Sequence, residues 1–411
     1  MTAPARQPAD APPLAFREFV PLIAALMALG SLGIDSMLPA LPAIGSSLGV
    51  VTENERQLIV TAFLIGMGLG QLIHGPLADR YGRRPVMIGA LVVYFASNIV
   101  AALAGDFALM LAMRAVGGVS IAATRVVTIA LVRDCYTGRA MARVMSLAFI
   151  VFMIMPVLAP TFGQTILLFG AWRWIFGMTA LGTAIVVGWF SLRMPETLRP
   201  EDCRPLAPRR IALGWWRTVT DRWSLGYTLA SAALLGALYG YINSVQQIMF
   251  DTFHRPRLLV AVFAITAATM ALTNFMNARL VMRLGTRVIS HTALLTQIAL
   301  SGIHLAIALA GYETLTTFII LQALTMGCFG LATSNFSAMA MENMGHIAGS
   351  ASSVQGFIGV TGGALIGAVI GQAFRGTTVP LYVGFFGAGL IALALILVTE
   401  RGRLFRGHMG G

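Results

Sequence analysis

Long apolar stretches alternate with short polar connections along almost the whole chain. Because backbone polar groups must pair internally in hydrocarbon, apolar stretches of about 20 residues form membrane-spanning helices. A transmembrane barrel would show short segments of alternating hydrophobicity, and the sequence has none. We therefore predict an all-α integral membrane protein with twelve transmembrane helices. They cover roughly residues 18–42, 56–76, 85–104, 107–132, 141–167, 171–192, 224–249, 258–281, 286–310, 314–340, 346–372 and 379–399.

Composition and charge support this class. Of the 411 residues, 57% are hydrophobic and 11% are charged, and the mean hydropathy is +0.80. A soluble domain has about 25% charged residues, so a water-soluble globule is excluded. The net charge of +12 lies mostly in arginines of the connections on one side of the predicted membrane. This positive-inside bias predicts that both termini are cytoplasmic, and it explains the charge without a nucleic-acid partner.

One long polar stretch, residues 193–222, divides the predicted spans into six and six and carries seven arginines. Segment 278–287 faintly repeats segment 75–84, keeping an arginine, a glycine and a second arginine. Such a repeat predicts two pseudo-symmetric six-helix bundles with a binding site between them near the middle of the membrane. We expect a disordered cytoplasmic tail at 1–17, bundles at 18–192 and 223–400, a cytoplasmic linker at 193–222 and a cytoplasmic tail at 401–411.

The connection between the second and third spans is short and densely charged. Its arginines and aspartate are too polar for hydrocarbon, so it lies at a membrane surface, where its glycines let the chain reverse tightly. Asp134, at the end of the fourth span, offers a partner for the arginines. We expect a latch that closes the cytoplasmic side, with Asp79 held at the N-terminus of a neighbouring helix. Its members are Gly75, Asp79, Arg80, Gly82, Arg83, Arg84 and Asp134.

Charged side chains also occur inside predicted spans. Asp35 lies in the first span, just before Pro39 loosens the helix. Arg114 and Arg125 lie about three turns apart on one face of the fourth span. Counting about 1.5 Å per residue places Asp35 and Arg114 at the same depth. Charges at such depth are costly unless they are paired or hydrated, so they indicate a pathway through the membrane.

Asp35 is the candidate for carrying a proton. Burial favours the neutral form of a carboxyl group and a nearby cation favours the charged form, and a transporter can use that competition. The structural alternative is a fixed ion pair with Arg114. Arg125 could instead extend to the cytoplasmic surface. For His304, in the ninth span, we expect a hydrogen-bonded packing role.

Segment 75–84 resembles the signature between the second and third spans of major facilitator transporters: glycine, three residues, Asp-Arg, one residue, Gly-Arg-Arg. Further segments resemble bacterial drug:proton antiporters of the bicyclomycin and chloramphenicol resistance type, and the likeness covers about residues 18–400. These segments are Asp35 with Leu38-Pro39-Ala40, Arg114 with Gly117-Gly118, Arg133-Asp134, Pro156 to Gly163, Trp172 to Phe176, Pro195-Glu196-Thr197 and Ala348 to Ser352.

The resemblance implies the major facilitator fold, a multi-pass protein of the bacterial inner membrane, and proton coupling through Asp35 and Arg114. It also implies an antiporter motif in the fifth span, carried here by Pro156, Pro160 and Gly163. This chain departs from the family pattern at Gln164, where a second glycine is usual, and in the seventh span. The candidates for contact with the substrate are Arg125, Phe152, Met155, Gln164, Tyr239, Asn243, Gln246 and Gln247.

These observations favour a proton-coupled exporter of small organic compounds that alternates between two open states, working as a monomer in the lipid bilayer. The alternative is a proton-coupled or facilitated transporter of a specific metabolite such as a sugar, an organic acid or an amino acid. A membrane sensor would need an appended signalling domain, and an enzyme would need a nucleotide loop, zinc pattern or nucleophile elbow; none is found. The three cysteines lack metal or disulfide spacing, so we expect neither a metal nor a cofactor.

Overall fold

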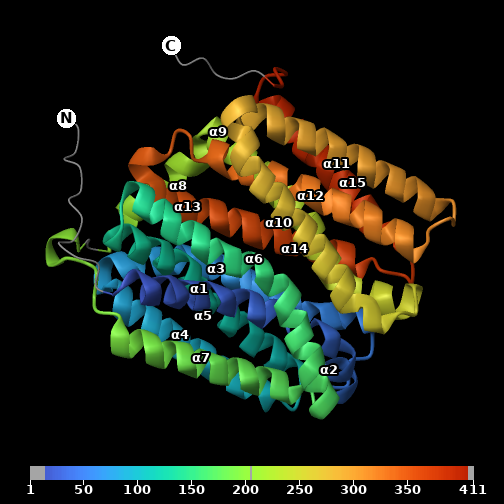
Figure 1. Ribbon diagram of the computed structural model, residues 1–411, viewed down its shortest axis with the longest axis horizontal. Helices are drawn as coiled ribbons and strands as arrows, with labels where there is room; N and C mark the ends of the chain where they lie inside the picture. The colour runs from blue at the N-terminus through green and yellow to red at the C-terminus, as the bar shows by residue number, and fades with distance from the viewer. Residues whose placement is uncertain (1–13, 204–205, 406–411) are drawn as a thin grey trace.

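A computed structural model describes residues 14–203 and 206–405, and every regular element within these ranges is a helix (Figure 1). The first half contains α1 (Phe16–Asp35), α2 (Leu41–Ser47), α3 (Leu58–Tyr81), α4 (Arg83–Ala102), α5 (Phe107–Cys135), α6 (Gly138–Phe169) and α7 (Arg173–Arg193). Helix α8 (Pro208–Thr220) lies in the linker. The second half contains α9 (Arg222–Gln247), α10 (Leu259–Leu284), α11 (Thr286–Leu309), α12 (Leu315–Ala340), α13 (Ala348–Phe357), α14 (Gly363–Gln372) and α15 (Val379–Thr399).

Short turns of other helix types join or interrupt these elements. The π-helix η7 (Ile358–Gly362) joins α13 to α14, so the three form one continuous span. A second π-helix, η4 (Ile248–Thr252), extends α9. The 3₁₀ turns are η1 (Leu38–Ala40), η2 (Glu53–Gln57), η3 (Pro200–Asp202), η5 (Pro256–Leu258) and η6 (Gly345–Ile347).

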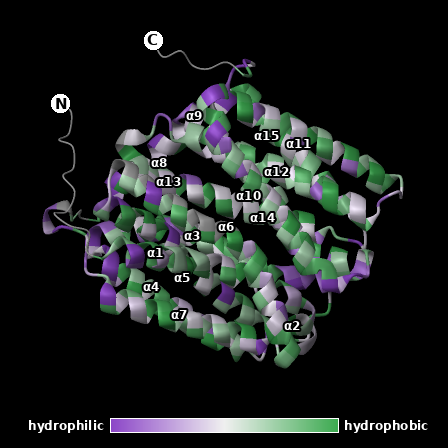
Figure 2. Ribbon diagram, in the orientation of Figure 1, coloured by the Kyte–Doolittle hydropathy of each residue, from purple (hydrophilic) through white to green (hydrophobic). Residues whose placement is uncertain are grey.

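Eleven helices in the described part of the chain are long and apolar enough to cross a membrane. Helix α6 is 32 residues long, and its described apolar part is the shorter stretch Ile154–Phe169. Figure 2 shows hydrophobic residues along the helices and hydrophilic ones gathered near their ends. The all-helical membrane class predicted from the sequence is therefore confirmed, while the count of twelve stays a prediction.

The helices of each half pack mainly against one another (Figure 1). In the first half α3 packs on α5, α4 on α7 and α1 on α6; in the second half α9 packs on α14 and α15, and α12 on α10 and α11. Helix contacts join the halves in two places: α3 lies against α13 and α14, and α6 lies against α10. Both ends of the described chain lie on one side, which we call the terminal side; the opposite side is the far side.

The predicted tails lie mostly outside the described residues, which omit 1–13 and 406–411. Helix α1 begins at Phe16, two residues earlier than the predicted bundle. The linker holds a feature that the sequence analysis did not predict: helix α8, which packs against α13 and the start of α9.

Glycines of α3 and α5 allow these two helices of the first half to pack closely. A Cβ atom built on Gly66 would lie 2.1 Å from the carbonyl oxygen of Ala115, and one on Gly118 would lie 2.0 Å from that of Phe63. Real Cβ atoms do not approach oxygen so closely, so only glycine lets these backbones touch. Gly66 therefore serves packing within the first half at this position.

Candidate functional site

Asp35 ends helix α1 in the interior of the first half. Beyond it the chain passes into a turn and then η1, as Pro39 predicts, and the hydroxyl of Ser36 donates to the Leu32 carbonyl at 2.6 Å. The Asp35 side chain is only 5% exposed. Among the described residues it has neither a hydrogen-bond partner nor an ion-pair partner. It is thus a buried acid without a compensating cation.

Arg114 reaches α1 at the depth of Asp35, but it binds the backbone and not the carboxylate. Its Nη2 donates to the carbonyl oxygen of Gly33 at 2.6 Å, and its guanidinium lies over the ring of Phe63 at 4.1 Å from the centroid. The last carbonyls of a helix lack partners within the helix, and a cation there satisfies them. Arg114 therefore caps the broken end of α1, and the fixed Asp35–Arg114 ion pair is not formed.

Helix α6 touches α1 directly beside Asp35. A Cβ atom built on Gly163 would lie 1.7 Å from the carbonyl oxygen of Ser36, so only glycine fits this contact. Pro160 is buried and Pro156 is half-buried within the same helix. The residues of the expected antiporter motif thus bring α6 against the chain next to the acid.

The remaining α6 candidates are less constrained. Gln164 and Met155 are half-buried, and the side chain of Phe152 lies outside the described part of the chain. None of the three is joined to Asp35 by a described hydrogen bond.

Side-chain amides hydrogen-bond the two halves to each other on the far side, and we call these contacts the amide seal. Gln57 donates to Gln247 and to the carbonyl of Gly371, the latter at 3.1 Å, and Gln247 donates to Asn54 at 2.8 Å. Asn54 and Gln372 exchange two further bonds, with Asn54 Nδ2 3.0 Å from the Gln372 carbonyl. The polar end of α9 predicted as a substrate contact therefore includes Gln247, which closes the far side in this state.

The other α9 candidates lie deeper. Asn243 is buried, and both its amide atoms lack a partner among the described residues. Gln246 is buried as well, and the ring of Tyr239 packs on Gly363 of α14. An unsatisfied buried amide is costly, so Asn243 is a group that a bound molecule or water would stabilise.

Arg125 differs from Arg114 in being exposed. It lies in the middle of α5 and close enough to Tyr239 of the second half for its charge to act on that phenol. A cation within a span is stable only where it reaches water or a partner. Arg125 therefore marks a solvated space between the halves.

Polar pairs between α10 and α12 were not among the sequence candidates. Ser334 donates to Asn274 Oδ1 at 2.7 Å, and Asn335 Nδ2 donates to Asn277 at 3.0 Å. The sequence signal that could have identified these pairs is an isolated polar residue within an apolar span, because such a residue is costly there without a partner.

The turn at 75–84 forms a charge cluster on the terminal side. Arg83 is buried and contacts two carboxylates, Asp79 at 2.6 Å and Asp134 at 3.1 Å. The expected partnership of Asp134 with a loop arginine is thus present. Asp79 forms its ion pair with Arg83 of the same 75–84 segment. It also lines a cavity of about 170 Å³, to which residues at the start of α13 contribute as well. Arg80 is exposed and makes no described ion pair.

Glu196 completes this cluster, and the sequence analysis missed its role. Its carboxylate accepts the backbone N–H groups of Arg83 at 2.9 Å and Arg84 at 3.1 Å, so it caps the N-terminus of α4. Gly82 has φ +105°, and a Cβ there would meet the Glu196 carboxylate at 2.3 Å. The turn therefore needs glycine for its conformation and for this approach. Gly75 of the same turn faces Ser353 of α13.

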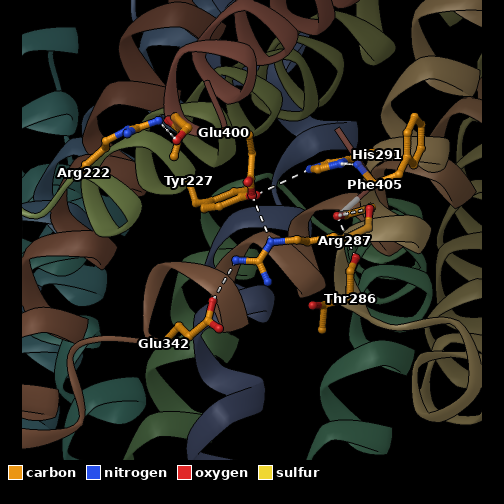
Figure 3. A network of polar contacts seen from close by, with 10 residues as sticks. Arg222, Tyr227, Thr286, Arg287, His291, Glu342, Glu400 and Phe405 are labelled. Carbon is orange, nitrogen blue, oxygen red and sulfur yellow. Dashed lines mark hydrogen bonds and ion pairs between the residues drawn. The ribbon is translucent and has the colours of Figure 1, made fainter. Parts of the chain in front are cut away.

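A second cluster occupies the matching place in the second half (Figure 3). Arg287 contacts Glu400 at 3.0 Å and Glu342 at 3.1 Å, and the hydroxyl of Tyr227 also donates to Glu400. The backbone N–H of Phe405 donates to Nδ1 of His291 at 3.2 Å. The repeat noted in the sequence pointed to Arg287 but not to its carboxylates, which come from the ends of α12 and α15.

His304 has the hydrogen-bonded packing role expected from the sequence. Its Nε2 lies 2.7 Å from Glu313, which also accepts the hydroxyl of Thr378, and its ring stacks on Tyr382. The group ties together α11, the start of α12 and the start of α15.

Comparison with known proteins supports the assignment of this architecture. The family profile described as Major Facilitator Superfamily matches residues 23–368. The chain is 28% identical to the bicyclomycin resistance protein homolog of Haemophilus influenzae, over 95% of this chain and 98% of that protein. It is 28% identical to a chloramphenicol resistance protein of Pseudomonas aeruginosa, covering 90% and 88% of the two chains. The crystal structure of the human organic anion transporter MFSD10 matches with a TM-score of 0.68 at 19% identity, over 94% of this chain and all of that chain, which shows the shared fold.

Proposed function

The chain belongs to the major facilitator superfamily, and on that premise we propose that it exports small organic compounds, drugs among them, in exchange for protons. Relatives named for resistance to bicyclomycin, to chloramphenicol and to multiple drugs match it over nine-tenths or more of its length, which supports this substrate class. We place it in the inner membrane of a bacterium with both termini in the cytoplasm, as a monomer without catalytic activity or cofactor. The arginine-rich connections of the terminal side support this orientation.

The observation that carries the proposal is the buried, unpaired carboxyl group of Asp35 at the broken end of α1. An isolated carboxylate in an apolar interior is costly, so the group is stable there with a proton and loses it on meeting water. Arg114 supports this role indirectly. By binding the Gly33 carbonyl, it fixes the end of α1 and leaves the acid free to change its charge.

The contacts between the halves suggest how protonation is coupled to movement. The far side, which is the outer side in this orientation, is closed by the amide contacts of Asn54, Gln57 and Gln247. Arg125 is exposed between the halves, so the water that reaches it comes from the cytoplasmic side. A substrate entering there would meet Arg125 and Tyr239, with Asn243, Gln246, Gln164, Met155 and Phe152 as further candidates. Transport then requires the amide seal to open and the cytoplasmic side to close.

Gly163 links the acid to this movement. It holds α6 against the chain at Ser36, and α6 also packs on α10 of the second half. A shift of α6 when the halves rock would therefore change the surroundings of Asp35. The charge cluster of Gly75, Asp79, Arg80, Gly82, Arg83, Arg84 and Asp134 would stabilise the terminal end of the first half during the same movement.

The test uses purified protein in proteoliposomes with an imposed pH gradient and radiolabelled chloramphenicol as the first probe. We expect Asp35→Asn to abolish proton-driven accumulation while exchange of labelled for unlabelled chloramphenicol continues, because exchange needs no net proton transfer. The matched control is Glu201→Gln, which neutralises an exposed carboxylate in the linker. Proton-driven accumulation by the Asp35→Asn protein at the wild-type rate would refute the assigned role of Asp35.

A further inference from the structure

Helix α8 of the linker carries an exposed face that no other part of the chain covers within the described residues. The side of the helix that faces the protein contains Gly214 and Thr218, and a Cβ built on Gly214 would lie 2.9 Å from the Ser350 side chain of α13. On the other side, Trp216 is 65% exposed and Leu213 is 47% exposed. Trp216 and Leu213 therefore form a small exposed apolar strip along the outer side of the helix.

Positive charges flank these apolar side chains. At 100° per residue, Arg209, Leu213, Trp216 and Arg217 fall on one arc of the helix, and Arg210 lies at its edge. All three arginines are exposed, and the helix contains no acidic residue. The nearest aspartate, Asp221, is engaged as the N-cap of α9, where it accepts the Ser224 N–H at 2.7 Å. The face is therefore apolar in its middle and cationic around it.

The depth of α8 follows from its connections. Only one residue separates it from α9, a membrane span, and it packs on the start of α13, which begins another span. Helix α8 thus lies level with the ends of two spans, where the lipid headgroups begin. Helices with this pattern lie in the interface, with apolar residues entering the acyl boundary and arginines reaching the phosphates.

We propose that the exposed face of α8, formed by Arg209, Leu213, Trp216 and Arg217, binds the anionic phospholipid surface of the leaflet on the terminal side. Charge complementarity selects this occupant: a cationic, acid-free face attracts phosphate groups that carry net negative charge, such as those of phosphatidylglycerol. Because α8 packs on α13, which lies against α3 of the first half, the bound lipid would sit beside a contact between the halves.

The first measurement locates residue 216. A nitroxide is attached at Trp216→Cys in a Cys203→Ser/Cys328→Ser background, which retains only the buried Cys135, and the protein is placed in nanodiscs of phosphatidylcholine with phosphatidylglycerol. We expect the label to be more accessible to oxygen than to a water-soluble nickel complex. A label at Glu201→Cys, in the polar part of the linker, should show the reverse order.

The second measurement tests the charges. Competition between spin-labelled phosphatidylglycerol and phosphatidylcholine gives the relative association of the two lipids. Each arginine beside an anionic surface contributes up to about fivefold in affinity, so Arg209→Gln/Arg217→Gln should lower the preference for phosphatidylglycerol several-fold. Arg199→Gln/Arg403→Gln removes the same charge from exposed positions off the helix and should leave the preference unchanged.

Three outcomes would overturn the proposal. The label at residue 216 could be fully accessible to the nickel complex, which would place the face in water. The lipid preference could survive the loss of Arg209 and Arg217. Dipolar broadening between labels at residue 216 in nanodiscs holding two copies would show that a second copy of the chain covers this face.

Discussion

Each half of the protein holds one buried arginine between a buried and an exposed carboxylate, and this arrangement gives a quantitative prediction. In the second half, Arg287 contacts Glu400, whose side chain is 4% exposed, and Glu342, whose side chain is 49% exposed. Both contacts have nearly the same length, so a count of ion pairs would give them equal weight. Burial makes them unequal, because water screens the exposed pair and not the buried one.

The expected magnitudes differ several-fold. Removing one partner of a buried pair costs about 3–5 kcal/mol, because the remaining charge is left uncompensated. Glu400→Gln keeps an acceptor for Tyr227 and leaves Glu342 beside Arg287, so we expect the lower end, about 3 kcal/mol. Glu342→Gln should cost about 0–1 kcal/mol, the range of exposed pairs. In a half of this size, a loss of 3 kcal/mol would lower Tm by about 6–12 °C.

The measurement is thermal unfolding of the purified variants in one detergent, with recovery of the monodisperse fraction after heating as a second readout. The first half offers an independent repeat: Arg83 contacts Asp134, 6% exposed, and Asp79, 42% exposed, so Asp134→Asn should destabilise far more than Asp79→Asn. Equal losses for Glu400→Gln and Glu342→Gln would refute the reasoning, since they would show that burial does not set the strength of these pairs.

Two further predictions concern the contacts that position and close the site. Gly163→Val should abolish transport and lower Tm, because its Cβ would lie 1.7 Å from the Ser36 carbonyl oxygen and force α6 away from α1. The control is Gly177→Val, because no atom lies within 4 Å of a Cβ built at that position. Equal effects of the two substitutions on transport and Tm would contradict this reasoning. Gln57→Leu removes both hydrogen bonds that this side chain donates across the far side and leaves the buried Gln247 Oε1 without its donor, which costs about 1–3 kcal/mol. Pulsed EPR between spin labels at Val51 and Arg375 should then show a larger far-open population, and an unchanged distance distribution would argue against the amide seal.

The sequence alone determined the class of this protein and the location of its main charges. Hydrophobic stretches of span length dictate membrane helices because no other structure satisfies the backbone in hydrocarbon. Asp35 could be selected for the same reason, since a charge in an apolar run is costly wherever the helix lies. The break after Asp35 was also predictable, because Pro39 affects the backbone locally.

Only the tertiary structure decided which groups these charges meet. Depth along a helix predicted that Arg114 and Asp35 lie level, but whether a guanidinium binds a carboxylate or a carbonyl depends on helix rotation and packing, which spacing does not fix. Glu196 and Glu400 are far in sequence from the arginines they serve, and no local pattern records such a pairing. Gln247 likewise was predicted to line the cavity, but the approach of η2 gives it hydrogen-bond partners in Gln57 and Asn54. Side-chain partners are set by distances between helices, and those distances arise from the packing of the whole molecule.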